Sequence, residues 1–161
     1  MKNKTAKSWK IYKESLKYLA AGSSTGSKRP SFKNVEPALF VKGKGCRVWD
    51  ADGNEYIDFR SGIGPVSLGY SNSDVDNAIK NQMNNGIVFG YPHPLEGEVA
   101  RILTENIPCA EKVRFLKTGG EAVAACIKIA RAATGRNKIV QCGYNGWLNS
   151  LSTGGFMPVG I

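Results

Sequence analysis

The residues with the clearest chemical potential form a glycine-rich turn, Thr118-Gly119-Gly120-Glu121. An apolar run over residues 113–116 precedes the turn, and a helical pattern follows it as far as Thr134. Amide N–H groups at a helix N-terminus have no partner within the helix, and glycine lets an anion approach them. The turn is therefore a candidate phosphate site, to which Thr118 adds a hydroxyl while Glu121 caps the helix. An ordinary βα turn that uses glycine for packing explains the same residues equally well.

A second group of candidate residues follows a predicted strand over residues 138–142, in Gly143-Tyr144-Asn145-Gly146-Trp147. A strand, a helix and a parallel strand place the two strand ends at one edge of a sheet, where ligands of open α/β sheets bind. Tyr144 would then lie beside the glycine turn and could stack on a planar ligand. A core position for Tyr144 or Trp147 is an equal alternative.

The cysteines and the histidine do not form a recognisable metal or disulfide pattern. The chain has one histidine, His93, in a proline-rich stretch, and we predict no role for it. The four cysteines are far apart in sequence and form no CxxC pair, so we predict no metal site and instead expect buried thiols in a reducing compartment. They are Cys46, Cys109, Cys126 and Cys142.

Basic residues are concentrated at the N-terminus. Of the 161 residues, 22 are Lys or Arg and 13 are Asp or Glu, and residues 1–33 hold nine of the cations but a single acid, Glu14. We interpret this charge as a solvated face and predict neither a nucleic-acid nor a membrane partner. Without a secretory signal or a membrane-spanning run, the chain is predicted to be cytoplasmic. A helical stripe predicts that the arm docks by one face, through Trp9, Tyr12, Leu16 and Leu19.

The region between the arm and the glycine turn predicts a β segment followed by two helices. Alternating runs over residues 46–50 and 55–59 flank an Asp-Gly step, which favours an antiparallel hairpin. Helices are predicted over residues 74–84, with Ser73 as N-cap, and over residues 95–105. The second helix is expected to turn four apolar residues inward: Leu95, Val99, Ile102 and Leu103.

We divide the chain into three parts on these patterns. Residues 1–33 form a basic helical arm and linker, residues 34–70 an antiparallel β segment, and residues 71–161 the beginning of a large α/β domain. Two parallel strands are too few for a stable parallel sheet. We therefore expect an N-terminal fragment of a longer protein, with an unpaired strand edge and exposed apolar helix surface.

Blocks of sequence that follow one another along nearly the whole chain carry a family resemblance. They are Gly43-Lys44-Gly45 and residues 48–58, 64–69, 118–122, 128–131, 134–136, 138–139 and 144–146. These blocks resemble the class III (ornithine-aminotransferase-like) family of pyridoxal-phosphate enzymes, especially its glutamate-1-semialdehyde aminomutase-like branch. The match covers roughly the first third of a typical member of that family.

The resemblance implies an α/β, fold-type I transferase that acts as a homodimer and carries pyridoxal 5'-phosphate. It implies that Thr118, Gly119 and Gly120 bind the cofactor phosphate, that Tyr144 stacks on the ring, and that Asn145 lies close to it. The lysine that forms the Schiff base and the acid that binds the pyridine nitrogen lie downstream in the family. We therefore predict no catalytic residue in this chain, and no activity for it alone.

Departures from the family pattern bear on the finer function. Gly120 stands where the family usually has a hydroxyl residue, which leaves backbone contact alone at that position. Ile63, in the substrate-facing bend, stands where true aminomutases carry tryptophan, which favours an aminotransferase with an unidentified amino donor. Lys117 adjoins the anion turn and Lys128 lies mid-helix, so neither replaces the missing lysine.

The implied reaction moves an amino group between an amino compound and an oxo acid or aldehyde, by a transaminase or aminomutase. A non-catalytic module that binds a phosphorylated ligand is the main alternative. A nucleic-acid binder that uses the basic arm is a weaker one, because little aromatic surface accompanies the charge.

Overall fold

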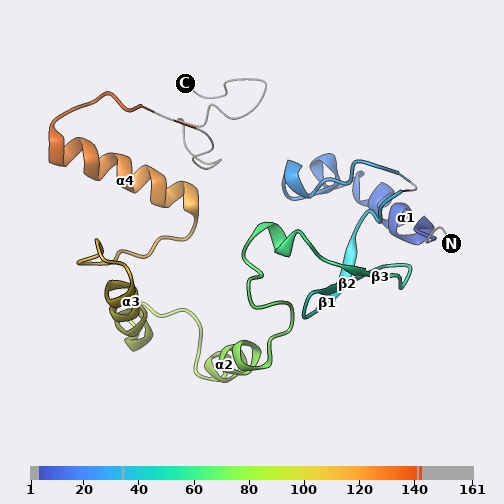
Figure 1. Ribbon diagram of the computed structural model, residues 1–161, viewed down its shortest axis with the longest axis horizontal. Coiled ribbons are helices and arrows are strands. Elements are labelled where there is room, and N and C mark those ends of the chain that lie inside the picture. Colours follow the sequence, from blue (N-terminus) through green and yellow to red (C-terminus); the bar gives the residue numbers. More distant parts are fainter. Residues whose placement is uncertain (1–3, 34, 141, 143–161) are drawn as a thin grey trace. The chain divides into compact units, whose positions relative to one another are not determined.

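The computed structural model describes residues 4–33, 35–140 and 142 (Figure 1). The chain divides into two compact units, Met1–Val88 and Phe89–Ile161. The first unit contains helix α1, a three-stranded sheet and helix α2, and the second contains helices α3 and α4. The helices are α1 (Ala6–Ser15), α2 (Ser73–Asn84), α3 (Pro94–Asn106) and α4 (Gly119–Thr134).

The sheet of the first unit is antiparallel, in the order β1-β2-β3. Val48 at its centre is buried and lies opposite Gly43 on one side and Tyr56 on the other. The tight turn between the second and third strands places Gly53 at φ +86°, a conformation that glycine adopts without strain. The predicted hairpin is therefore confirmed. The strands are β1 (Phe40–Lys44), β2 (Arg47–Asp50) and β3 (Glu55–Ile57).

Helix α1 is capped by a residue of the hairpin. The side chain of Thr5, at its own N-cap position, makes no capping hydrogen bond. The carboxylate of Asp52 instead accepts hydrogen bonds from the amides of Lys7 and Ser8, at 2.9 and 2.7 Å. A carboxylate there satisfies unpaired helix amides and interacts favourably with the helix dipole.

The first unit also contains a buried serine that joins α1 to the strand entering the sheet. Ser8 is fully buried, and its hydroxyl oxygen accepts from the amides of Ala38 and Leu39, at 2.8 and 3.0 Å. Because buried amides are costly to leave unpaired, this hydroxyl holds the arm against the sheet segment.

Aromatic residues complete the docking of the arm. The indole N–H of Trp9 donates to the carbonyl of Glu36 at 2.9 Å, and the hydroxyl of Tyr12 donates to the carbonyl of Ala21 at 2.8 Å. Docking by one face is thus confirmed for Trp9 and Tyr12. Two residues of the predicted stripe lie beyond the helix end and are exposed, Leu16 and Leu19.

The hairpin turn is organised by a buried carboxylate. Asp50 is 1% exposed and accepts hydrogen bonds from the amides of Asp52 and Asn54 and from the hydroxyl of Tyr56. Burial raises the pKa of Asp50, but hydrogen bonds, above all those from Asn54, outweigh it and lower the pKa below its ordinary value. The amide side chain of Asn54 also donates to the carbonyl of Lys4 at 2.8 Å, so the turn holds the arm at a second point.

Two helix caps differ from the prediction. Asn72, not Ser73, caps α2, because its side-chain oxygen accepts from the amides of the first turn. His93 caps α3 through Nδ1, which accepts from the amide of Leu95 at 3.2 Å, while Glu96 accepts from the amide of His93. His93, for which we predicted no role, therefore has a structural one.

Neither predicted parallel strand forms among the described residues. Residues 113–116 and 138–140 have no ladder partner there, and Val140 is fully exposed. A strand is stabilised by a hydrogen-bonded neighbour, and the described part of the chain supplies none to these segments. The helix between them forms as expected: α4 ends at Thr134, and Gly135 caps it with a φ of +66°.

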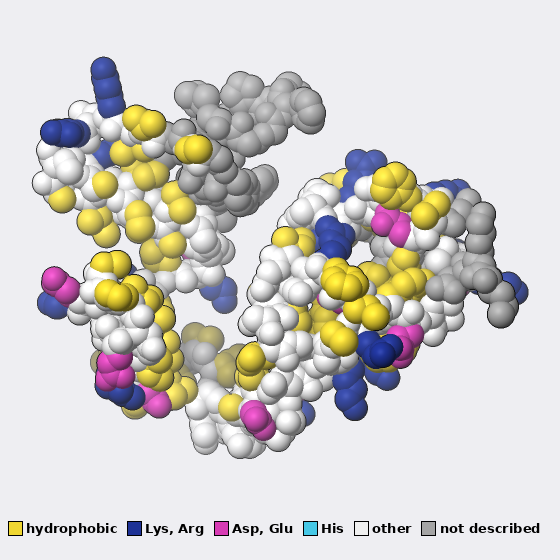
Figure 2. Space-filling model, viewed as in Figure 1, with side chains coloured by type: hydrophobic (Ala, Val, Ile, Leu, Met, Phe, Trp, Pro, Cys, Tyr) yellow, Lys and Arg dark blue, Asp and Glu magenta, His cyan; other side chains and the backbone are white. Residues whose placement is uncertain are grey.

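Apolar helix faces remain exposed, as expected for an incomplete core. Figure 2 shows hydrophobic side chains at the surface over α3 and α4. The predicted inward face of α3 is wrong for Leu95, Val99 and Ile102, each more than two fifths exposed, because no described layer covers it. All four cysteines are exposed, so the expectation of buried thiols is wrong. None of the described helices has the length and hydrophobicity that crossing a bilayer requires.

Candidate functional site

The predicted glycine turn forms the N-terminus of α4, and it carries a reciprocal cap. The hydroxyl oxygen of Thr118 accepts from the amide of Glu121 at 3.3 Å, and the Glu121 carboxylate accepts from the amide of Thr118 at 2.8 Å. Each side chain thus satisfies one amide at the start of the helix. The expectation that Glu121 caps the helix is confirmed.

The cap does not pair the backbone amides of Gly119 and Gly120. The amide of Ala122 donates to the carbonyl of Thr118 at 3.0 Å, so the helix is regular from that point. Within the described part of the chain, no group accepts from the amides of Gly119 and Gly120. Gly119 is exposed, and a Cβ added to it would meet no described atom within 4 Å, whereas Gly120 is buried.

This arrangement favours an anion. Two unpaired amides and the positive end of the α4 dipole attract negative charge at the same place. The Thr118 hydroxyl accepts from Glu121 yet keeps its own proton, which it can donate to a third group. A metal ion has no comparable site, since the described residues contain no group of three His, Cys, Asp or Glu side chains that could hold one.

The other predicted site residues lie in the first unit or outside the described residues. Tyr144 and Asn145 lie outside the described residues. Ile63 belongs to the first unit, where it is 51% exposed and lines a cavity of about 570 Å³ together with Tyr12 and Arg60. The glycine turn and the predicted substrate-facing residue therefore belong to different units of the chain.

A hydrogen-bonded pair beside Ile63 was not identified from the sequence. The hydroxyl of Tyr70 donates to the carboxylate of Asp58 at 2.7 Å, and both residues line the same cavity as Ile63. The bond from Tyr70 lowers the pKa of Asp58, and the carboxylate raises the pKa of Tyr70. The one sequence signal for this pair is an acid that shortly precedes a glycine-rich bend.

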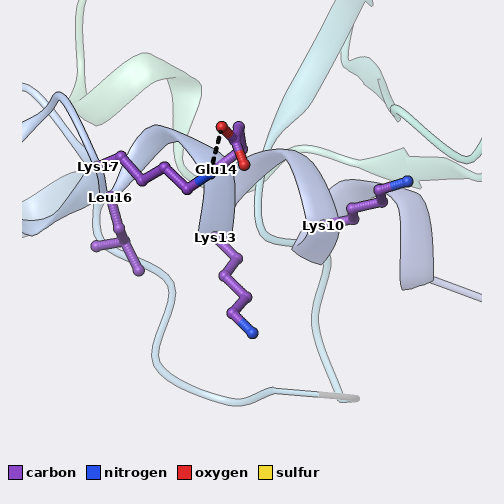
Figure 3. A pocket seen from close by; sticks show the side chains of 5 residues that line it. All are labelled: Lys10, Lys13, Glu14, Leu16 and Lys17. Carbon is purple, nitrogen blue, oxygen red and sulfur yellow. Dashed lines mark hydrogen bonds and ion pairs between the residues drawn. The ribbon is translucent and has the colours of Figure 1, made fainter.

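The basic arm presents a shallow hollow on the solvent side of α1 (Figure 3). Lys17 pairs with Glu14 at 2.8 Å, but both side chains are more than half exposed, and such pairs contribute little. The side chains of Lys10 and Lys13 point in different directions and away from this pair (Figure 3). These cations do not converge on one point, which agrees with a solvated face.

Comparison with known proteins gives the family. The sequence model of the family described as Aminotransferase class-III matches residues 30–155. The chain is 41% identical over 151 residues to a glutamate-1-semialdehyde 2,1-aminomutase of Persephonella marina (strain DSM 14350 / EX-H1), covering 92% of this chain and 35% of that protein. It is also 41% identical over 149 residues to a 3-aminobutyryl-CoA aminotransferase of Cloacimonas acidaminovorans (strain Evry), covering 91% and 36%.

A solved structure agrees with the sequence relatives. It is described as a transaminase with PLP bound, and it matches with a TM-score of 0.83 and 32% identity, over 92% of this chain and 35% of its own. The described fold is therefore that of the N-terminal region of a fold-type I transferase. The chain spans about a third of the length of the curated relatives it matches. It belongs to the class-III aminotransferase family.

Proposed function

We propose that this chain is the N-terminal part of a pyridoxal-phosphate-dependent transaminase or aminomutase. The reaction would transfer an amino group between an amino compound and an oxo acid or aldehyde. Support comes from the family, from the two curated relatives, and from the related transaminase with PLP bound. The observation that carries the proposal is the cap of α4, which pairs the flanking amides and leaves those of Gly119 and Gly120 without an acceptor among the described residues.

The residues at this turn fit a phosphate group. The amides of Gly119 and Gly120 would donate to its oxygens, and the Thr118 hydroxyl would add a third donor. The α4 dipole favours a dianion there, while Glu121 is held back by its bond to the Thr118 amide. Tyr144 would stack on the cofactor ring with Asn145 beside it. When bound, the cofactor supplies the electron sink that amino transfer requires.

This chain would bind and orient but not catalyse. The covalent lysine and the acid for the pyridine nitrogen are expected in the part of the relatives that lies beyond the matched third. Ile63 would face the substrate, and its aliphatic side chain favours an aminotransferase over a strict aminomutase. A cytoplasmic homodimer completes the proposal.

The phosphate assignment can be tested by titrating inorganic phosphate, and then pyridoxal phosphate, into the ¹⁵N-labelled chain. We expect the amide signals of Gly119 and Gly120 to shift with either ligand. Gly119→Val should weaken binding by about tenfold, because its side chain blocks the approach to amides that bond a charged group. Gly97→Val is the matched control, since a Cβ at Gly97, also in the first turns of a helix, likewise meets no described atom within 4 Å.

One result would refute the phosphate site, and another would refute the amino-transfer activity. Equal weakening by both valine variants, or signals at the turn that do not move, would refute the phosphate site. Amino transfer is assayed with the protein encoded by the complete reading frame that includes this chain. Phosphate binding without amino transfer by that protein would instead support the non-catalytic binding module.

A further inference from the structure

The bend that carries Ile63 has a conformation that must be held in place. Its four residues all have positive φ: Ser61 +47°, Gly62 +61°, Ile63 +68° and Gly64 +111°. Two of them are not glycine, and the left-handed region is costly for residues with a side chain. Two hydrogen bonds link residues of this stretch only to one another. The amide of Ile63 donates to the Arg60 carbonyl, and the amide of Gly64 donates to the Ser61 carbonyl. A contact from outside the bend is needed to select this conformation.

The carboxylate of Asp58 supplies that contact. It accepts from the amide of Arg60 at 2.8 Å, and the amides of Ser61 and Gly62 also stabilise its negative charge. The backbone at the entrance to the bend therefore favours the charged form of this carboxylate. The bond from the Arg60 amide fixes the chain direction there.

Tyr70 in turn fixes the carboxylate to the sheet. Its hydroxyl donates to Asp58 at 2.7 Å, and its backbone pairs with Gly45, with N–H to carbonyl distances of 2.8 and 2.9 Å. Its ring lies against Gly43 of β1, where an added Cβ would overlap the ring. Tyr70 is thus positioned by backbone atoms at the end of β1.

We propose that Asp58 and Tyr70 are positioning residues, which hold the bend so that Ile63 forms part of the wall of the substrate cavity. The inference rests on the proposed function, in which Ile63 faces the substrate. Asp58, Tyr70 and Ile63 line the same cavity of about 570 Å³. The pair acts on specificity through Ile63, by setting where its side chain meets a bound substrate.

Amide hydrogen exchange in the chain tests the hold on the bend. Tyr70→Phe removes the hydroxyl and keeps the ring, and Asp58→Asn removes the charge. Each should speed exchange of the Ile63 and Gly64 amides by about tenfold, the effect of losing one hydrogen bond to a charged group. Tyr18→Phe, at an 85% exposed tyrosine, should change nothing. Unchanged exchange at Ile63 and Gly64 in both variants would overturn the proposal.

A rescue variant separates positioning from general destabilisation. Ser61→Gly removes the side chain that makes the left-handed conformation costly, so it should restore slow exchange in the Asp58→Asn background. Ser67→Gly is the control, because Ser67 is exposed in the same loop and does not have positive φ. Rescue by Ser61→Gly alone supports the proposal, and equal or absent rescue by both contradicts it.

Kinetics of the protein from the complete reading frame test the effect on specificity. Tyr70→Phe should raise KM for the amino substrate several-fold and leave kcat and cofactor affinity unchanged. An unchanged KM with a disturbed bend would refute the role in specificity. If the wild-type protein transfers no amino groups, the proposed function fails, and the role in specificity fails with it, while the exchange data still decide whether Asp58 holds the bend.

Discussion

The N-terminal amides of helices α1 and α4 are capped in opposite ways. The cap of α1 comes from Asp52, 44 residues beyond Ser8 in sequence, whereas α4 is capped by Thr118 and Glu121 at its own start. Helix α1 also buries Ser8 and Tyr12 against the rest of its unit, whereas α4 leaves most of its apolar face exposed. The start of α1 therefore depends on the tertiary fold, and the start of α4 depends on local sequence.

The location of the cap also decides which amides remain available. At α1 the Asp52 carboxylate occupies the amides of Lys7 and Ser8, so the helix end is already neutralised by a charge of the protein. At α4 the cap takes the amides on either side and leaves those of Gly119 and Gly120 without an acceptor among the described residues. Self-capping is what allows α4, and not α1, to offer a site for an anion.

The largest effect on this comparison is expected from Asp52→Ala. Loss of the cap should lower the free energy of unfolding of the first unit by about 2 kcal/mol, the upper end for an N-cap, because two amides lose a charged acceptor. Urea titration followed by tryptophan fluorescence measures it, since Trp9 and Trp49 both belong to the first unit. Asp52→Asn, which keeps a capping oxygen, should lose less than half as much. Equal losses for Asn and Ala would show that charge alone matters.

A smaller and local effect is expected from Thr118→Ala. Removal of the hydroxyl should cost about 1 kcal/mol and speed hydrogen exchange of the Glu121 amide. Thr118→Ser keeps the hydroxyl and serves as control. Exchange in α1 should stay as in the unmodified chain, and Asp52→Ala should leave exchange in α4 unchanged. An effect of either variant on the other helix would contradict the distinction between remote and local caps.

The smallest effect is expected from acid, and it should be confined to the first unit. The pKa values of Asp50 and Asp58 lie below the ordinary value of 3.8. Near that pH the folded chain therefore binds fewer protons than the unfolded chain. Their stabilisation is fully present above the unfolded pKa and is lost as pH falls through the folded pKa. Urea midpoints should therefore fall from about pH 5 downward. Asp50→Asn should flatten this profile, and an unaltered slope would contradict the assignment.

Features encoded by neighbouring residues were predictable from the sequence. The Asp-Gly step gave the correct hairpin, Gly135 marked the end of α4, and Glu121 caps the helix that begins at the glycine turn. Remote contacts were not predictable, because nothing in the pattern near residue 7 points to Asp52. The cap at His93 was missed because imidazole is not among the preferred capping side chains.

Burial was the weakest part of the prediction. A periodic pattern identifies which face of a helix is apolar, but not whether another layer covers it. The inward face predicted for α3 and the strand over residues 113–116 both depend on such a layer. The Asp58–Tyr70 pair was missed for a related reason: the two residues meet only because a strained bend and the end of β1 bring them together.

The hairpin turn over residues 50–54 has a consequence for protein engineering. Exposed loop tips usually tolerate inserted residues and new chain ends. At this tip, however, the buried Asp50 carboxylate accepts from the loop amide of Asn54, and the Asp52 carboxylate accepts from the first-turn amide of Ser8 in α1. The side chain of Asn54 donates to the carbonyl of Lys4. One extra residue would shift all three side chains out of register with their partners. An epitope tag or permuted terminus placed there would therefore weaken the attachment of the N-terminal arm, leaving only contacts such as those of Ser8 and Trp9.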